Sequence, residues 1–313
     1  MWGDPGTYWK FLVPLWCLCL FLWQFWVQRP TQRNAPITYA AEIQTTDAQP
    51  LTPRAQGVLR LAAKRRGAQS VIADLRHEGS LKALFPQVRG DALDAVFLNT
   101  AGGLTGGDRM QIDVTAQANA HVTVSSQAAE RAYRAQPGQI AHSYVTLDVA
   151  AGGRIDWLPQ ETILFDQAAL NRRLNVRLAG TASALLVEPL IFGRVAMGET
   201  VDALHLTDQW RVWQDGALIF ADAVRLIGDA QAVMHEKAIA NGAGAMATVL
   251  FASPQAAAFA DRLSLPDTSG ASLIRDDVLL VRLLAADGFT LRKQLIPVVE
   301  ALSTAPLPRV WRL

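Results

Sequence analysis

One segment of the sequence has residue types that suggest ligand chemistry, the glycine-rich stretch of residues 99–110. It places Gly102, Gly103, Gly106 and Gly107 directly ahead of Asp108 and Arg109. Glycine tolerates positive φ and lets the backbone approach another group closely, so phosphate binding is one interpretation. The stretch lacks both the Gly-Lys-Ser/Thr of a P-loop and the G-x-G-x-x-G order of a dinucleotide fold, which disfavours nucleotide binding. The alternative is a tight connection between a strand that ends at Leu98 and one that begins at Met110, although such a connection does not require the Asp-Arg pair.

Metal chemistry in this chain would depend on carboxylates. Both cysteines, Cys17 and Cys19, precede residue 30, so the rest of the chain has no thiolate cage. The five histidines are His77, His121, His142, His205 and His235, and no two have H-x-H or H-x-x-x-H spacing. Imidazole and thiolate bind transition metals best, whereas carboxylates bind divalent ions weakly and release them. We therefore predict no tight metal site and interpret each histidine as a structural or surface residue.

Covalent catalysis is disfavoured by the residues that are missing. The chain has no G-x-S-x-G elbow, and no cysteine follows residue 30. The one serine next to a histidine, in His142-Ser143, would point to the opposite face of a strand. A hydrolase that uses two carboxylates stays open as an alternative, because the spacing of such a pair is spatial rather than sequential.

Composition narrows the class of protein. Half of the 313 residues are hydrophobic, which is enough for one large core or two smaller ones. The 29 Lys and Arg residues nearly balance the 28 Asp and Glu residues, a net charge of +1, and we predict no nucleic-acid partner. The absence of a disulfide framework is typical of a cytoplasmic protein.

The first 44 residues differ from the rest. They contain five of the nine tryptophans and an apolar run, residues 11–27, at the lower limit of what spans a bilayer. Arg29 and Arg33 follow the run, which would leave the downstream chain in the cytoplasm. The two interpretations are a membrane anchor and a start codon assigned too far upstream. Residues 45–56, with Pro50 and Pro53, are predicted to be a linker.

Period-two alternation predicts a mostly β, layered fold for residues 57–313. Three apolar alternations are Met110-Ile112-Val114, Val145-Leu147-Val149 and Leu174-Val176-Leu178. Turns such as Gly152-Gly153 and Asp215-Gly216 separate strands without long helical patterns, so a doubly wound α/β fold is disfavoured.

Two or three short helices complete the prediction. One covers residues 255–263 after the capping pair Ser253-Pro254. The second covers residues 290–302, with a kink expected at Pro297. A helical turn is also expected at residues 127–133.

Three blocks of sequence resemble the UreD (also called UreH) family of urease accessory proteins in content and order. They are residues 102–109 (GGLTGGDR), 126–134 (SQAAERAYR) and 157–166 (WLPQETILFD). Later similarities are residues 188–194 (EPLIFGR), 197–199 (MGE) and 306–311 (PLPRVW). The resemblance covers residues 57–313 and leaves the first 44 residues outside.

The resemblance implies a cytoplasmic, β-rich scaffold without catalytic activity. It implies binding to UreF, UreG and apo-urease, with nickel passing transiently toward the urease active site and no tightly bound cofactor. A membrane-attached binding protein is the alternative, with membrane contact only through residues 11–27.

At the matching positions the family usually carries acidic residues that affect nickel delivery. The candidates for a nickel path are Asp108, Glu130, Glu188 and Asp222, and the motif residues with a structural role are Gly102, Gly103, Gly106, Gly107, Arg109 and Arg194. Structural alternatives stay open: Asp108 caps the glycine loop, and Glu188 pairs with Arg194. For Asp222 the available cations are Arg194 and Arg225.

Overall fold

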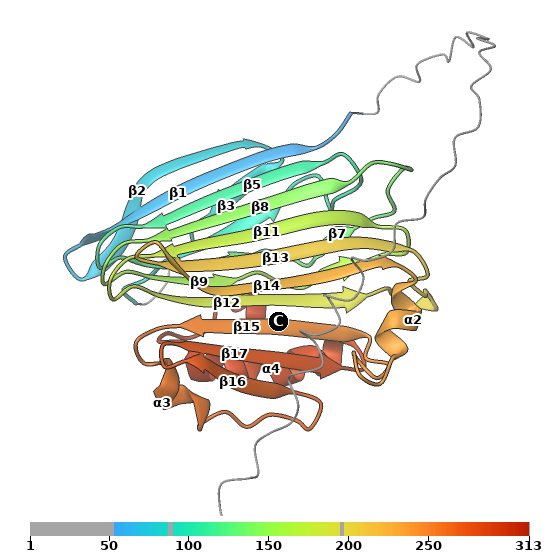
Figure 1. The fold of residues 1–313 in the computed structure, drawn as a ribbon. Helices are drawn as coiled ribbons and strands as arrows, with labels where there is room; N and C mark the ends of the chain where they lie inside the picture. The colour runs from blue at the N-terminus through green and yellow to red at the C-terminus, as the bar shows by residue number, and fades with distance from the viewer. Residues whose placement is uncertain (1–52, 87–89, 195–196, 313) are drawn as a thin grey trace, which may run out of the picture.

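The computed structural model describes residues 53–86, 90–194 and 197–312, and most of these residues lie in two β-sheets (Figure 1). The first sheet, sheet A, has the strand order β14-β13-β11-β8-β5-β1-β2. Its strands are β1 (Gln56–Arg66), β2 (Gln69–Gly79), β5 (Arg109–Ala116), β8 (Ala141–Val149), β11 (Ala169–Leu178), β13 (Leu204–Gln214) and β14 (Ala217–Gly228).

The second sheet, sheet B, has the order β16-β17-β15-β12-β9-β6-β4-β3, and β10 and β7 extend from β12. Its main strands are β3 (Leu81–Leu84), β4 (Leu93–Asn99), β6 (His121–Ser126), β9 (Arg154–Leu158), β12 (Ser183–Phe192), β15 (Ala245–Ala252), β16 (Gly270–Arg275) and β17 (Val278–Ala285). The two extending strands are β7 (Glu130–Ala132) and β10 (Thr162–Leu164).

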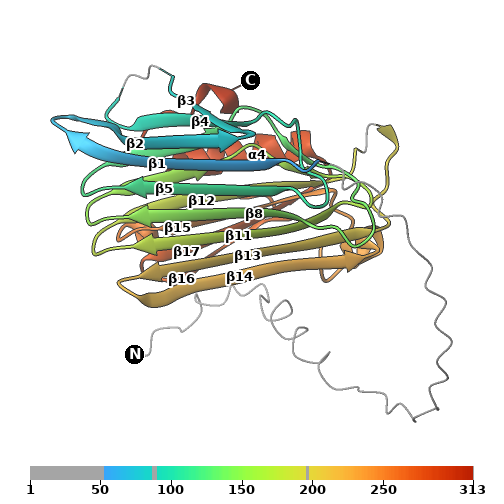
Figure 2. The same ribbon diagram turned by 90° about the horizontal axis from the view of Figure 1, so that it is seen from above.

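From β4 to β13 the chain winds as a solenoid, placing one strand in sheet B and the next in sheet A (Figure 2). Within each sheet, strands from successive coils are parallel. The crossovers of this parallel sheet are strands of the opposite sheet rather than helices, which confirms the layered β prediction and the absence of a doubly wound fold.

The two ends of the solenoid have different connections. At the short-turn end, residues 117–120, 150–153 and 179–182 lead from sheet A to sheet B, and Asn119, Gly152 and Gly180 have positive φ there. At the long-loop end, residues 100–108, 127–140, 159–168 and 193–203 lead back from sheet B to sheet A. The longer connections of the solenoid therefore lie at the same end.

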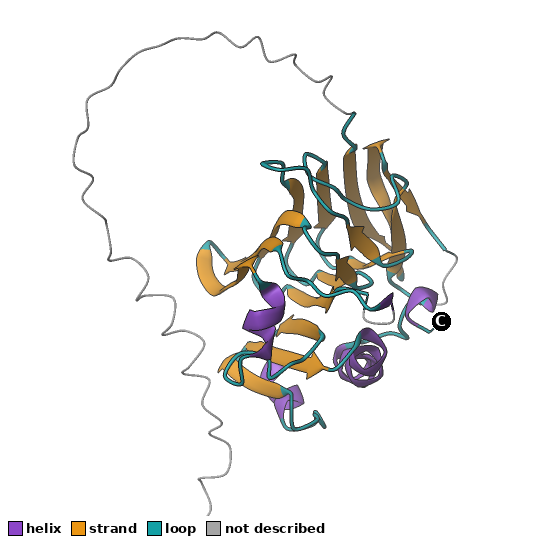
Figure 3. Ribbon diagram, turned by 90° about the vertical axis from the view of Figure 1, so that its right-hand side faces the viewer, coloured by secondary structure: helices purple, strands orange, loops and turns teal. Residues whose placement is uncertain are grey.

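Sheet B is covered on both faces, whereas the helices leave sheet A covered on one. The inner face of sheet B packs on sheet A. The outer face of sheet B packs on α4 (Gly288–Leu302), which is seen end-on in Figure 3. β12 is accordingly buried almost continuously, as expected for a strand between two layers. β11 in sheet A alternates between buried and more exposed positions.

The helix predictions were right for two segments and wrong for a third. Helix α4 has Pro297 inside it, and α3 (Ala256–Ala260) is shorter than predicted. The expected helical turn at residues 127–133 is wrong, because β7 occupies its centre and forms a parallel pair with β10. An additional helix, α2 (Ala230–His235), begins after the N-cap Asp229.

The predictions for residues 1–44, and for the linker as far as residue 52, fall outside the described residues. Within residues 53–86, 90–194 and 197–312, no helix combines the length and the apolar character needed to cross a membrane.

Candidate functional site

The long-loop end brings together segments from four successive coils. β10 pairs in parallel with both β12 and β7, and a bridge between Leu104 and Ala132 continues this short ladder into the glycine loop. The Leu104 amide donates to the Arg131 carbonyl at 2.7 Å, and the Tyr133 amide donates to the Leu104 carbonyl at 2.7 Å. The sequence blocks at residues 102–109, 126–134 and 157–166 therefore lie in contiguous layers.

Asp108 stabilises the glycine loop from within. Its side chain is buried, and its two carboxylate oxygens accept hydrogen bonds from the backbone amides of Ala55 and Thr105, each at 2.8 Å. This is the capping role that the sequence left open. It ties the loop to the residues that enter β1.

Two glycines of the loop, Gly103 and Gly106, lie where a side chain would overlap neighbouring residues, which favours a packing role over anion binding. A Cβ atom on Gly103 would lie 2.3 Å from the Tyr133 ring and 2.7 Å from the Arg131 carbonyl oxygen. A Cβ atom on Gly106 would lie 2.6 Å from the Gln139 carbonyl oxygen. Gly102 has φ +79° but faces open space. Glycine at positions 103 and 106 therefore allows the loop to pack closely against residues 131–139 of the next coil.

We expect Gly103→Ala to lower the free energy of unfolding by about 3 kcal/mol, because backbone strain and overlap with β7 add together. Gly102→Ala is the matched control, with about 1 kcal/mol expected from positive φ alone. Urea denaturation of the two variants tests this expectation. Equal losses of stability would show that contact with β7 does not explain the glycine at position 103.

Glu130 lies beside the same loop. The Asn99 Nδ2 atom is 3.3 and 3.4 Å from its carboxylate oxygens and also donates to the Gly103 carbonyl at 3.0 Å. Burial raises the pKa of Glu130, and the negative charge of Asp108 acts in the same direction. The long-loop end thus carries two of the four predicted path carboxylates.

Arg194 does not pair with Glu188, so that structural alternative was wrong. Arg194 lies in the loop after β12 and forms a two-point ion pair with Glu199 at 2.8 and 3.1 Å. Its guanidinium lies 4.3 Å above the centre of the Phe165 ring. Because an extended chain advances roughly 3.3 Å per residue, the six-residue separation places Arg194 far along the strand direction from Glu188.

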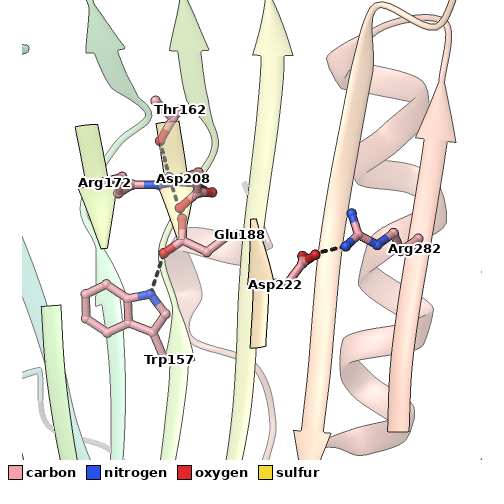
Figure 4. A network of polar contacts seen from close by, with 7 residues as sticks. All are labelled: Trp157, Thr162, Arg172, Glu188, Asp208, Asp222 and Arg282. Carbon is pink, nitrogen blue, oxygen red and sulfur yellow. Dashed lines mark hydrogen bonds and ion pairs between the residues drawn. The ribbon is translucent and has the colours of Figure 1, made fainter. Parts of the chain in front are cut away.

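Glu188 instead belongs to a buried charge cluster between the sheets (Figure 4). Arg172 on β11 has Nη1 2.5 Å from the Glu188 carboxylate and Nη2 2.6 Å from the Asp208 carboxylate on β13. Trp157 Nε1 donates to Glu188 at 2.8 Å, and Arg172 also donates to Thr162 Oγ1 at 3.1 Å. The side chains of the three charged residues are at most 7% exposed, so solvent screens the cluster very little.

The cluster contains two carboxyl groups and one guanidinium. Burial raises the pKa of Glu188, an effect that Arg172 opposes and Asp208 reinforces. Burial would lower the pKa of Arg172, but Asp208 and Glu188 outweigh that effect and raise it. Within the described residues, Arg172 Nε and Asp208 Oδ1 have no hydrogen-bond partner. Of these two atoms, Asp208 Oδ1 is an acceptor that could take one more proton or cation, whereas Arg172 Nε is a donor.

Asp222 occupies a different place, at the edge of sheet A. It forms an ion pair of 2.5 Å with Arg282 on β17 (Figure 4), and the two side chains are 22% and 28% exposed. The expectation that Arg194 or Arg225 would neutralise Asp222 was wrong, because β14 and β17 meet across the two sheets. The remaining motif residue, Arg109, is exposed at the start of β5.

The four predicted carboxylates thus fall into separate environments, with Asp108 and Glu130 at the long-loop end, Glu188 inside and Asp222 at an edge. Among the residues that the structure describes, no three His, Cys, Asp or Glu side chains are grouped to hold a metal ion. A surface hollow of about 380 Å³ lies elsewhere, beside the end of α4 and the C-terminal segment, and none of the four carboxylates lines it.

Sequence reasoning missed Arg172 and Asp208, although the alternating pattern contains a signal for both. Arg172 stands between Leu170 and Leu174, and Asp208 stands between Leu206 and Trp210, each in a position of the buried face. A charged residue at such a position needs a partner. The sequence pattern does not indicate that Thr162 and Trp157 contact this cluster.

Comparison with known proteins agrees with this arrangement of motifs. The family model described as UreD urease accessory protein matches residues 55–312. The chain belongs to the UreD family of urease accessory proteins. Among UreD relatives, the urease accessory protein UreD of Roseobacter denitrificans is 47% identical over 263 residues, covering 83% of this chain and 96% of its own. UreD of Ruegeria pomeroyi is 45% identical over 257 residues, covering 82% of this chain and all of its own.

A UreD protein from Rhizobium etli is 46% identical over 263 residues, covering 83% of this chain and 96% of its own. The family match confirms the resemblance read from the sequence blocks. Its limits, residues 55–312, coincide closely with the solenoid and the elements packed on it.

Proposed function

We propose that this chain is a maturation factor for urease, a scaffold without catalytic activity that helps to insert nickel into apo-urease in a complex with UreF and UreG. The observation that carries the proposal is the match to UreD proteins across the whole solenoid. The stacked loops at one end support it, because they offer a surface built from several coils. Cytoplasmic location is part of the proposal.

We further propose that nickel passes this subunit transiently, with carboxylates as weak ligands. The Glu188–Arg172–Asp208 cluster supports this part, since its carboxyl groups outnumber its cations. Asp108 and Glu130 would act at the long-loop end, and Asp222 at the sheet edge. Each of these four acids already has a partner within the chain, so nickel would have to compete with that partner. Such competition favours rapid release over tight binding.

A carboxylate-dependent hydrolase finds less support. Glu188 and Asp208 are two acids that share one arginine, and their side chains are only 6% exposed. A substrate cannot reach groups buried to that extent without a large opening of the fold. The membrane-attached alternative depends on residues 11–27, which are outside the described residues.

Co-purification tests the proposed complex. Affinity-tagged chain, expressed with UreF, UreG and apo-urease, should retain all three on a column and through gel filtration. A variant of the urease operon that lacks UreF tests whether contact with this chain depends on that protein. Retention of none of the three, with the tagged chain folded, would overturn the proposed role as a scaffold.

Deletion of residues 1–44 should leave urease activation unchanged, because the family match begins at residue 55. Urease activity in cells that express the truncated chain is the measurement. Loss of activation by a truncated chain that still folds would make the N-terminal segment a functional element.

A further inference from the structure

The outer face of sheet A, which points away from sheet B, is not covered by any helix of the described residues. Helices α3 and α4 contact strands of sheet B, and α2 contacts β14 near the sheet edge. Figure 2 shows the sheet as an outer layer of side-by-side strands. Such a face is available for a partner.

The register of the parallel strands arranges the side chains of this face in rows. The row nearest the long-loop end contains Arg109, His142, Asn171, Thr207 and Arg225. The next row contains Gln111, Tyr144, Arg173, Gln209 and Ala223. Across β5, β8, β11, β13 and β14, these two rows, which we call the arginine rows, contain three arginines and no carboxylate. Beyond β5 the second row continues to Glu78 on β2, which forms an ion pair with Arg76. The face therefore has a strong local positive charge although the whole chain has a net charge of only +1.

The three arginines of these rows have no ion-pair partner in the described part of the chain: none lies within 4.0 Å of a carboxylate, and all three are exposed. Two other arginines of the same face are paired, whereas Arg211, which follows Gln209 on the same side of β13, is exposed and has no ion-pair partner in the described part of the chain. Arg60 lies 3.3 Å from Asp113, and Arg177 pairs with Asp148. Unpaired positive charge on this face thus covers the arginine rows and continues to Arg211 in the next row.

The arginine rows are also held in place by local contacts. The Arg173 guanidinium lies 5.7 Å from the centre of the Tyr144 ring, and Tyr144 Oη is 3.0 Å from His142 Nδ1. Burial and the charges of Arg109 and Arg173 lower the pKa of His142. Tyrosine and arginine are among the residue types that most often dominate binding energy at protein interfaces.

Several observations select the kind of partner. Arg109 and Arg225 are four strand spacings apart, about 19 Å, which suits a broad protein surface. An exposed apolar side chain, Ile227 on β14, lies two residues beyond Arg225 and favours protein over a polyanion. A second copy of this chain would place like charges opposite each other in a two-fold contact.

We propose that the arginine rows form a docking surface for a partner protein that presents an acidic face. This inference rests on the proposed function and deepens it, because it assigns the surface by which the scaffold holds one member of the maturation complex. Charge complementarity speeds encounter and fixes orientation, and binding through it weakens as salt rises.

The test uses the full chain and purified UreF, UreG and apo-urease in binding measurements at low and at physiological salt. The variant Arg173→Glu/Arg225→Glu reverses the charge of the rows. The matched control, Arg60→Glu/Arg76→Glu, makes the same charge change on β1 and β2 of the same sheet, where each arginine has an acidic neighbour. Circular dichroism and thermal melting establish that both variants fold.

We expect the dissociation constant for one of the three partners to rise at least tenfold in Arg173→Glu/Arg225→Glu and less than threefold in the control. The wild-type affinity for that partner should fall as salt rises. Equal binding by the wild type and Arg173→Glu/Arg225→Glu would overturn the inference and leave the proposed function standing. If the wild type binds none of the three, the proposed function fails and the inference fails with it. Tighter wild-type binding to heparin than to any partner would also overturn the inference.

Discussion

Arg172→Met should lower the free energy of unfolding by about 3–5 kcal/mol, the cost of leaving buried charge without its partner. Arg172 is the shared cation of Glu188 and Asp208, and all three side chains are at most 7% exposed. Removal of the guanidinium leaves two carboxyl groups that must take up protons or draw in water. Urea denaturation at neutral pH measures the loss.

The matched variant for this cluster is Glu188→Gln. Glutamine keeps an acceptor for Trp157 Nε1 and leaves Arg172 and Asp208 as a balanced pair. We expect it to be far less destabilising than Arg172→Met at pH 7. Equal losses in the two variants would contradict an account in which charge balance governs the stability of the cluster.

The difference in unfolding free energy between the wild type and Glu188→Gln is expected to depend on pH. Burial raises the pKa of Glu188 above its ordinary value of 4.5, so the native state binds this proton more tightly than the unfolded chain does. The contribution of this group to stability is complete below pH 4.5 and is lost as pH rises from that value through the folded pKa. The wild type should therefore lose stability relative to Glu188→Gln over that window.

The second large effect concerns nickel. If Glu188 contacts nickel in passage, Glu188→Gln should lower the nickel content of urease about tenfold, a scale typical of losing a group that tunes a metal site. Because this variant is expected to fold, the accessory complex should still assemble. Nickel content by elemental analysis, together with pull-down of the partners, separates the two effects.

Asp222→Asn and Asp108→Asn are compared with Glu188→Gln in the same measurements of nickel content and complex assembly. Asp222 lies at a partly exposed edge and Asp108 accepts two backbone hydrogen bonds within a loop, so their structural tasks differ from that of Glu188. A Glu188→Gln complex that assembles and delivers nickel at the wild-type level would end the proposal that this residue lies on the nickel path. Glu188 would then have only its structural role.

The strands could be predicted from the sequence because a sheet with one buried face imposes a period of two. Leu174, Val176 and Leu178 show that period in β11, and the structure buries them. The period says nothing of which strand is the neighbour. The parallel winding that brings β5, β8 and β11 side by side depends on turns and long loops whose geometry the pattern does not contain.

The candidate site was predictable to a smaller extent. The hydrogen bond of Asp108 with the Thr105 amide follows from its position directly after the glycines, whereas the bond with the Ala55 amide joins residues 53 positions apart. The ion pairs of Glu188 and Asp222 join residues that are 16 and 60 positions apart in the chain, so only the assembled sheets identify Arg172 and Arg282 as their partners. The expected helix around Glu130 failed for a related reason, because pairing with β10 outweighs local helix propensity.

Nickel content of urease, measured with and without this chain at matched expression of urease, UreF and UreG, tests the central claim most directly. With the chain present, purified urease should contain nickel and hydrolyse urea. Without it, the urease polypeptide should be present but poor in nickel and inactive. Equal nickel content and equal activity in the two preparations would contradict the account.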